Sequence, residues 1–139
     1  MYKYLVLLVM FVINKSASND IILTLTEKSL LVNPTYLFEF ENEQYHTFTY
    51  CIGTDLSTEL QRYNEFTIIE QTTPNPLLGQ INLIEGNYKY NIYEQVSTTN
   101  LNPTGLTVVE TGYTKCINTT TYVPTYYTGA TLTNTAYEG

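Results

Sequence analysis

The sequence predicts an all-β protein: a single antiparallel β-sandwich, immunoglobulin-like or alternatively a jelly roll, with extended N- and C-terminal arms. Two observations predict this fold. Several short segments alternate apolar and polar side chains with the two-residue period of a half-buried strand, as in Tyr88-Lys89-Tyr90. These segments also follow one another at short intervals, which is typical of a sandwich or barrel. Only residues 56–63 carry a pattern that indicates a helical turn.

Seven strands are expected between residues 21 and 117, each bounded by turn residues. Gly86 tolerates positive φ and favours a tight hairpin, whereas Pro74 and Pro76 cannot donate to a strand ladder. Seven strands suit an immunoglobulin-like sandwich, and a jelly roll would need an eighth from residues 1–13 or 119–127. The expected strands are Ile21–Thr26, Thr35–Glu41, Tyr45–Ile52, Glu65–Gln71, Gln80–Ile84, Asn87–Gln95 and Leu106–Cys116.

Strand parity selects the residues that are expected to face the core. In the segment 45–52, the Phe48 and Tyr50 face is assigned to the core, so Cys51 is expected on the opposite face. Cys51 and Cys116 are therefore expected to remain free thiols, and the alternative is a single disulfide between them. The predicted core consists of Leu23, Leu25, Phe38, Phe40, Phe48, Tyr50, Phe66, Ile68, Ile81, Leu83, Tyr90 and Ile92.

Composition limits the classes of function. A chain of 139 residues is long enough for one domain with appendages. Its net charge of -7 argues against nucleic acid as a partner, because binding to phosphates needs a basic surface. Only 14% of the residues are charged, while Thr, Asn and Tyr are abundant, which suits exposed β-sheet faces.

The sequence offers little material for catalysis or metal binding. His46 is the single histidine and is expected at a strand edge, and no Gly-x-Ser-x-Gly motif accompanies it. One histidine and two distant cysteines lack the spacing of a zinc site, and two isolated aspartates do not form a calcium loop. Glu39, Glu41 and Glu43 are expected on a solvated strand face. We therefore predict no enzyme activity, no catalytic residue, no metal and no cofactor.

The N-terminal segment, residues 1–20, has three interpretations. Residues 4–13 are apolar and follow Lys3, which is typical of a secretory signal but too short for a membrane span of about 20 residues. Alternatively, translation begins at Met10, or the segment is an arm strand that pairs with a neighbour. In the last case, the expected assembly contacts are Leu5, Val6 and Leu7.

The C-terminal segment, residues 118–139, is rich in Thr and Tyr and nearly free of aliphatic residues. Such a segment buries too little apolar surface to fold alone, so it is either a disordered terminus or an arm that contacts a neighbouring subunit. The arm would have four aromatic anchors: Tyr122, Tyr126, Tyr127 and Tyr137.

The order of several segments resembles a set of small virion structural proteins of bacteriophages that infect Bacteroidota and of related environmental viruses. The resemblance spans about residues 10 to 117, and the family has no catalytic residue to carry over. The segments are Leu23-Thr24-Leu25-Thr26-Glu27-Lys28, Tyr36-Leu37-Phe38-Glu39-Phe40, Arg62-Tyr63-Asn64-Glu65-Phe66, Gly86-Asn87-Tyr88-Lys89-Tyr90-Asn91-Ile92-Tyr93-Glu94-Gln95 with Thr99-Asn100-Leu101, and Val109-Glu110-Thr111-Gly112.

The resemblance implies a virion subunit that assembles in many copies on the particle surface through sheet edges and terminal arms. Its partners would be copies of itself and other virion proteins, with no nucleic acid and no membrane span. The alternative is a secreted or surface-exposed β-sandwich module that binds glycans or a host surface, or a subunit of an extracellular filament.

Overall fold

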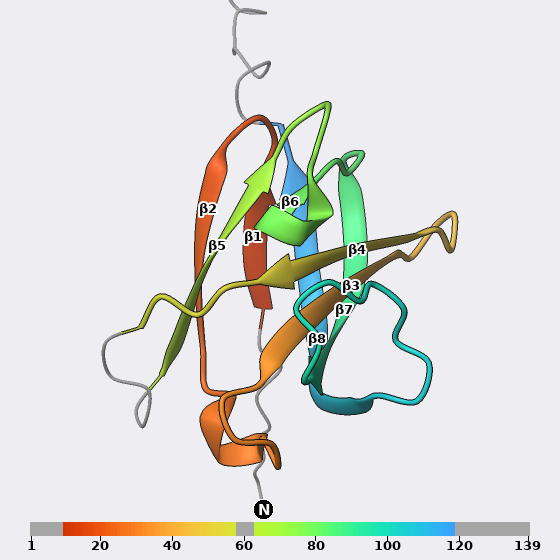
Figure 1. Ribbon diagram of the computed structural model, residues 1–139. Coiled ribbons are helices and arrows are strands. Elements are labelled where there is room, and N and C mark those ends of the chain that lie inside the picture. The colour runs from red at the N-terminus through yellow and green to blue at the C-terminus, as the bar shows by residue number, and fades with distance from the viewer. Residues whose placement is uncertain (1–9, 58–62, 119–139) are drawn as a thin grey trace, which may run out of the picture.

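The computed structural model describes residues 10–57 and 63–118 and confirms an all-β fold (Figure 1). Its two short 3-10 helices are η2 (Thr26–Lys28) and η3 (Pro76–Leu78), and these ranges contain no α-helix. The strands are β1 (Met10–Asn14), β2 (Ser18–Leu23), β3 (Thr35–Asn42), β4 (Phe48–Gly53), β5 (Asn64–Glu70), β6 (Gln80–Ile81), β7 (Gly86–Gln95) and β8 (Thr107–Ile117).

The strands form two sheets that pack in a sandwich-like arrangement. The larger sheet has the order β1-β8-β7-β3-β4, and the smaller has the order β2-β5-β6. The expectation of a purely antiparallel sandwich is wrong, because β1 pairs with β8, and β5 with β6, in parallel. Parallel neighbours need a crossover connection rather than a hairpin, and residues 15–106, with all the other strands, separate β1 from β8.

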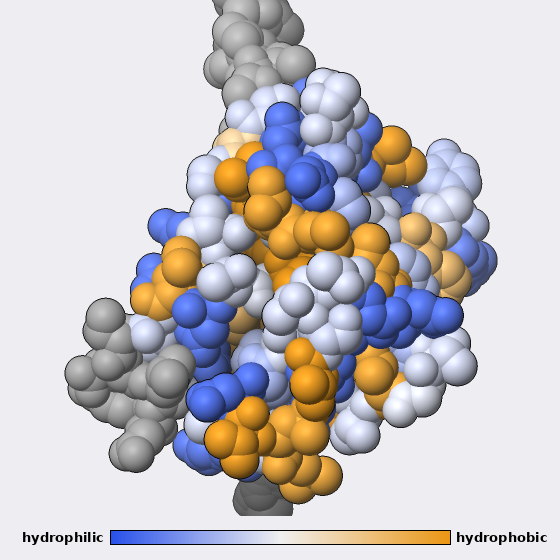
Figure 2. Space-filling model, in the orientation of Figure 1, coloured by the Kyte–Doolittle hydropathy of each residue, from blue (hydrophilic) through white to orange (hydrophobic). Residues whose placement is uncertain are grey.

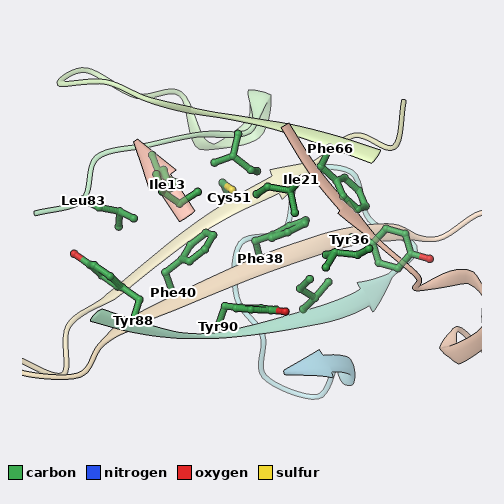
Figure 3. Close-up of a cluster of buried hydrophobic side chains, with 14 of the residues drawn as sticks. Ile13, Ile21, Tyr36, Phe38, Phe40, Cys51, Phe66, Leu83, Tyr88 and Tyr90 are labelled. Atoms are coloured by element: carbon green, nitrogen blue, oxygen red, sulfur yellow. The ribbon is translucent and has the colours of Figure 1, made fainter. Parts of the chain in front are cut away.

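The core lies between the two sheets and combines aliphatic side chains with several aromatic rings (Figure 3). The ring of Phe66 on β5 packs edge-on against Phe38 and Tyr36 of β3, with centroids 5.0 and 5.7 Å apart. Of the predicted core residues, all are buried except Phe48 and Tyr50. Strand parity therefore predicts the inward face correctly in β2, β3, β5 and β7.

The assignment of faces in β4 is wrong. Phe48 is 51% exposed, whereas Cys51 is fully buried in the core beside the residues of β3. The register of the β3–β4 hairpin explains the reversal, since Cys51 is the partner of Phe38 and Phe48 is the partner of Glu41. Cross-strand partners share a face, so β3 determines which side of β4 points inward.

Strand β1 shows that the packed region begins before Ile21. Ile13 is fully buried, and β1 leads through a short turn into β2 of the other sheet. The segments 1–9, 58–62 and 119–139 lie outside the described residues, and with them most of the expected helical turn at residues 56–63. Among the residues that are described, no helix is sufficiently long and apolar to cross a membrane.

Candidate interaction surface

The predicted assembly residues lie outside the described part of the chain: Leu5, Val6, Leu7, Tyr122, Tyr126, Tyr127 and Tyr137. The strands nevertheless determine where these segments join the domain. Because β1 and β8 are parallel neighbours, Met10 pairs with Tyr113 and Asn14 with Ile117. The chain therefore enters the sandwich at one end and leaves it, after Ile117, at the other (Figure 1).

The loop between η2 and β3 exposes three large aliphatic side chains at the end where the chain enters. Leu30 is 83% exposed, Val32 is 89% exposed and Leu31 is 38% exposed. We call these three residues the apolar ridge. Figure 2 shows apolar surface gathered at this lower end of the molecule. Exposed apolar patches of this kind are typical of interaction sites.

A buried carboxylate fixes the backbone of the ridge. Glu94, at the end of β7, is 4% exposed and accepts hydrogen bonds from the backbone N–H of Leu30, at 3.0 and 3.1 Å, and of Leu31, at 3.0 Å. Hydrogen bonds to an ionised acceptor are stronger than those between neutral groups. The ridge is thus a fixed feature of the surface, held in place by β7.

A cavity of about 690 Å³ opens beside the ridge, and its volume is within the usual range of ligand pockets. It lies between the loop 26–35, the ends of β3 and β4, the segment 53–57 and η3. Among the described residues that line it, Asp55 is the single charged one. The apolar part of the lining consists of Leu31, Val32, Pro34, Tyr36, Ile52 and Leu77.

Polar side chains hold the wall of the cavity. Asn64 accepts from the N–H of Leu25 at 2.6 Å and of Thr26 at 3.1 Å, and its amide group donates to Asp55 at 2.6 Å. The Tyr36 hydroxyl is 2.8 Å from the hydroxyl of Ser29. Burial raises the pKa of Tyr36, an effect that this hydrogen bond partly opposes. The cavity is therefore formed by the fold itself before any partner binds.

The outer face of the larger sheet carries a second cluster, centred on Glu39. Glu39 is 6% exposed and accepts from the hydroxyls of Tyr50 and Tyr93, both at 3.1 Å, and from the amide of Asn91 at 2.8 Å. The expectation that Glu39 is solvated is therefore wrong, because neighbouring strands cover it. Burial and the charge of Glu39 raise the pKa of Tyr93 to about 12. The ring of Phe48 stacks on Tyr50, with centroids 6.4 Å apart.

Two further buried carboxylates, those of Glu70 and Glu110, connect distant segments of the chain through hydrogen bonds. Glu70 accepts from the N–H of Ser16 at 2.7 Å, from the Lys15 ammonium at 2.9 Å and from the N–H of Leu83 at 2.9 Å. It therefore joins the β1–β2 turn to β5 and to the chain after β6. Glu110 on β8 accepts from the Lys28 ammonium.

His46 lies in the β3–β4 turn rather than within a strand, and its φ is 58°. Its Nδ1 is 3.2 Å from a carboxylate oxygen of Glu41 in an exposed setting. Within residues 10–57 and 63–118, no three His, Cys, Asp or Glu side chains come together as a metal site. Cys51 and Cys116 are buried free thiols, and burial raises their pKa values to about 12 and about 11.

The ridge and its cavity have no counterpart among the predicted site residues. The only sequence signal is the run Leu30-Leu31-Val32 directly before the turn residues Asn33-Pro34. An apolar run between two strands can equally enter the core, so its exposure depends on the bonds to Glu94. Comparison with protein-family models, curated proteins and solved structures gives no match.

Proposed function

We propose that this chain is a non-enzymatic structural subunit that assembles in many copies. The observation that carries the proposal is the entry and exit of the chain at opposite ends of one sandwich, through the neighbouring strands β1 and β8. In such subunits, the end at which one copy's chain leaves can contact the end at which the next copy's chain enters, and this contact can repeat along an assembly.

The segments that extend from these ends support the proposal. Residues 1–9 include the aliphatic Leu5, Val6 and Leu7, and residues 119–139 contain four tyrosines and a single charged residue, Glu138. Apolar and aromatic segments beyond a complete two-sheet core are suited to a surface on a neighbour. The edge strands β1 and β4 offer further backbone groups that a second copy can pair with.

The buried polar groups are consistent with a structural role. Glu70, Glu94 and Glu110 each accept a hydrogen bond from a distant part of the chain, and Glu39 joins three strands. A virion is the setting that we propose for this subunit, on the sequence resemblance alone.

The experiment that tests the proposal combines the mass of the purified native protein, sedimentation and negative-stain imaging. We expect a regular multimer at neutral pH. A protein that stays monomeric at the highest soluble concentration, while circular dichroism shows intact β structure, would contradict the structural role.

A glycan- or host-surface-binding module is the second candidate, and the outer face of the larger sheet favours it. Phe48 is 51% exposed and stacks on Tyr50, beside the carboxylate of Glu39. Aromatic faces next to hydrogen-bonding groups suit the apolar and hydroxyl-bearing faces of sugars. Retention of the monomer on a glycan array, with loss of retention in Phe48→Ala, would favour this candidate over the first.

A further inference from the structure

We infer that the cavity and the apolar ridge receive the C-terminal segment of a second copy, residues 119–139, in a head-to-tail contact. Tyr122 and Tyr126 are the anchors. This inference rests on the proposed structural function and names the site at which the subunits meet.

The geometry of the sheet argues that the occupant comes from another copy. Gly86 pairs with Cys116 near the exit of the chain, and Glu94 pairs with Tyr36 in the wall of the cavity. Eight residues along β7 separate these two positions, which is about 26 Å.

The first anchor, Tyr122, cannot span this distance, so the two anchors together cannot occupy the cavity of their own subunit. Tyr122 follows Asn118 by four residues and therefore lies within about 14 Å of it, even in a fully extended chain. Tyr122 therefore cannot enter the cavity of its own subunit. The cavity of a second copy placed end to end is adjacent to the exit and within reach.

The chemistry of the segment fits the cavity. The lining combines six apolar side chains with neutral polar groups, and its one carboxylate, Asp55, already accepts hydrogen bonds from the N–H of Glu65 and from Asn64. Among the described residues of the lining, no basic side chain is present to bind a strongly anionic ligand. Residues 119–139 are neutral except for Glu138, and in an extended chain Tyr122 and Tyr126 project from the same side.

The exposed ridge gives the contact its apolar area. Burial of apolar side chains is the main favourable term in the free energy of association. Covering Leu30 and Val32 would therefore stabilise the contact between two copies. Tyrosine is enriched at interface centres because its ring is apolar and its hydroxyl finds a partner. A tyrosine-rich segment is therefore a suitable cover for the ridge.

The test uses two variants of the full chain and a mixing experiment. The ridge variant is Leu30→Asp with Val32→Asp, at two exposed positions; the arm variant is Tyr122→Ser with Tyr126→Ser. Ile22→Asp is the matched control, because Ile22 is 63% exposed on β2 and outside the ridge. Sedimentation velocity of each protein, and of an equimolar mixture of the two variants, reports the species formed.

We expect oligomers larger than dimers for the wild type and the control, and monomers for each variant, with the Kd of association raised at least about 30-fold. The mixture should form a dimer and nothing larger. The ridge variant keeps an intact arm and the arm variant an intact cavity, so together they have one functional contact.

Several results would overturn the inference. If the wild type assembles and either variant assembles like it, the contact lies elsewhere while the structural function stands. If both variants are monomers and their mixture is too, the contact is not head-to-tail between these two surfaces. A monomeric wild type overturns the structural function and the inference together. Circular dichroism checks the fold, and Leu30→Ser with Val32→Ser replaces the ridge variant if the aspartates unfold it.

Discussion

Replacing Glu70 by glutamine removes one negative charge from the interior while keeping nearly the same shape. Glu70 is 2% exposed, and its two carboxylate oxygens accept from three donors, two in the β1–β2 turn and one in the chain after β6. One oxygen bonds to the N–H of Ser16, and the other to the N–H of Leu83 and to the Lys15 ammonium. In Glu70→Gln one of the oxygens becomes an amide nitrogen, which is a donor.

The expected loss follows from these contacts. If the remaining oxygen stays on Ser16, the new amide nitrogen faces two donors, Leu83 N–H and the Lys15 ammonium. A buried donor without an acceptor costs about 1 to 3 kcal/mol, and removing one partner of a buried ion pair costs about 3 to 5 kcal/mol. Lys15 is partly exposed and can turn to water, which reduces the second amount. We therefore expect the free energy of unfolding to fall by about 2 to 4 kcal/mol.

The dependence on pH gives the prediction a second test. Burial by itself would raise the pKa of Glu70, but the hydrogen bonds from Ser16, Lys15 and Leu83 outweigh it and lower the pKa below its ordinary value of 4.5. A carboxyl whose pKa is lower in the folded state stabilises the fold above its unfolded pKa. This contribution is lost as the pH falls through the folded pKa.

Urea unfolding followed by circular dichroism at pH 7 and at a series of lower pH values measures both effects. The difference in the free energy of unfolding between the wild type and Glu70→Gln should be largest at pH 7 and should shrink below about pH 4.5. Glu43→Gln is the matched control: Glu43 is exposed in the β3–β4 turn and should change stability by less than about 0.5 kcal/mol. Equal midpoints for the wild type and Glu70→Gln at pH 7 would refute the reasoning.

Three further predictions concern the core. In urea unfolding, Phe38→Ala should lower the free energy of unfolding by about 3 to 5 kcal/mol, and Phe48→Ala by less than about 1 kcal/mol. Equal losses would contradict the observed inward and outward faces of the β3–β4 hairpin. Gly53→Ala should lower the free energy of unfolding by about 1 to 3 kcal/mol, because the new Cβ would lie 2.5 Å from the ring of Phe38. Unchanged stability would show that the neighbouring rings can move to make room for the Cβ. Cys51 and Cys116, with their raised pKa values, should resist alkylation at pH 8 until urea unfolds the chain, and rapid labelling of the native protein would show that they are accessible.

The β3–β4 hairpin shows why the period of a sequence does not always identify the inward face. In β3, Phe38 and Phe40 alternate with Leu37, Glu39 and Glu41, and the face of Phe38 and Phe40 points into the core between the sheets. In β4, Phe48 and Tyr50 alternate with Thr49 and Cys51, yet the smaller pair faces the core. The inward space beside Phe38 and Phe66 is narrow, since even a Cβ at Gly53 would clash there. The larger side chains lie on the outer face instead.

The burial of several glutamates is a second feature that the sequence alone does not predict. A lone glutamate in a strand of alternating residues is expected in water, and Glu39, Glu70, Glu94 and Glu110 carry no sequence signal that distinguishes them from Glu43. Their burial depends on donors that lie far away in the chain, such as the N–H of Leu30 for Glu94. Such partners are brought together only by the packing of the two sheets.

The sequence by itself determined the all-β class, the approximate positions of seven strands and most of the core, because these depend on local side-chain period and on turn residues. Only the tertiary structure decided the parallel pairing of β1 with β8, the face of β4 that is buried, and the exposure of the ridge Leu30, Leu31 and Val32. Each of these depends on contacts between residues distant in sequence, and a local period carries no information about such contacts.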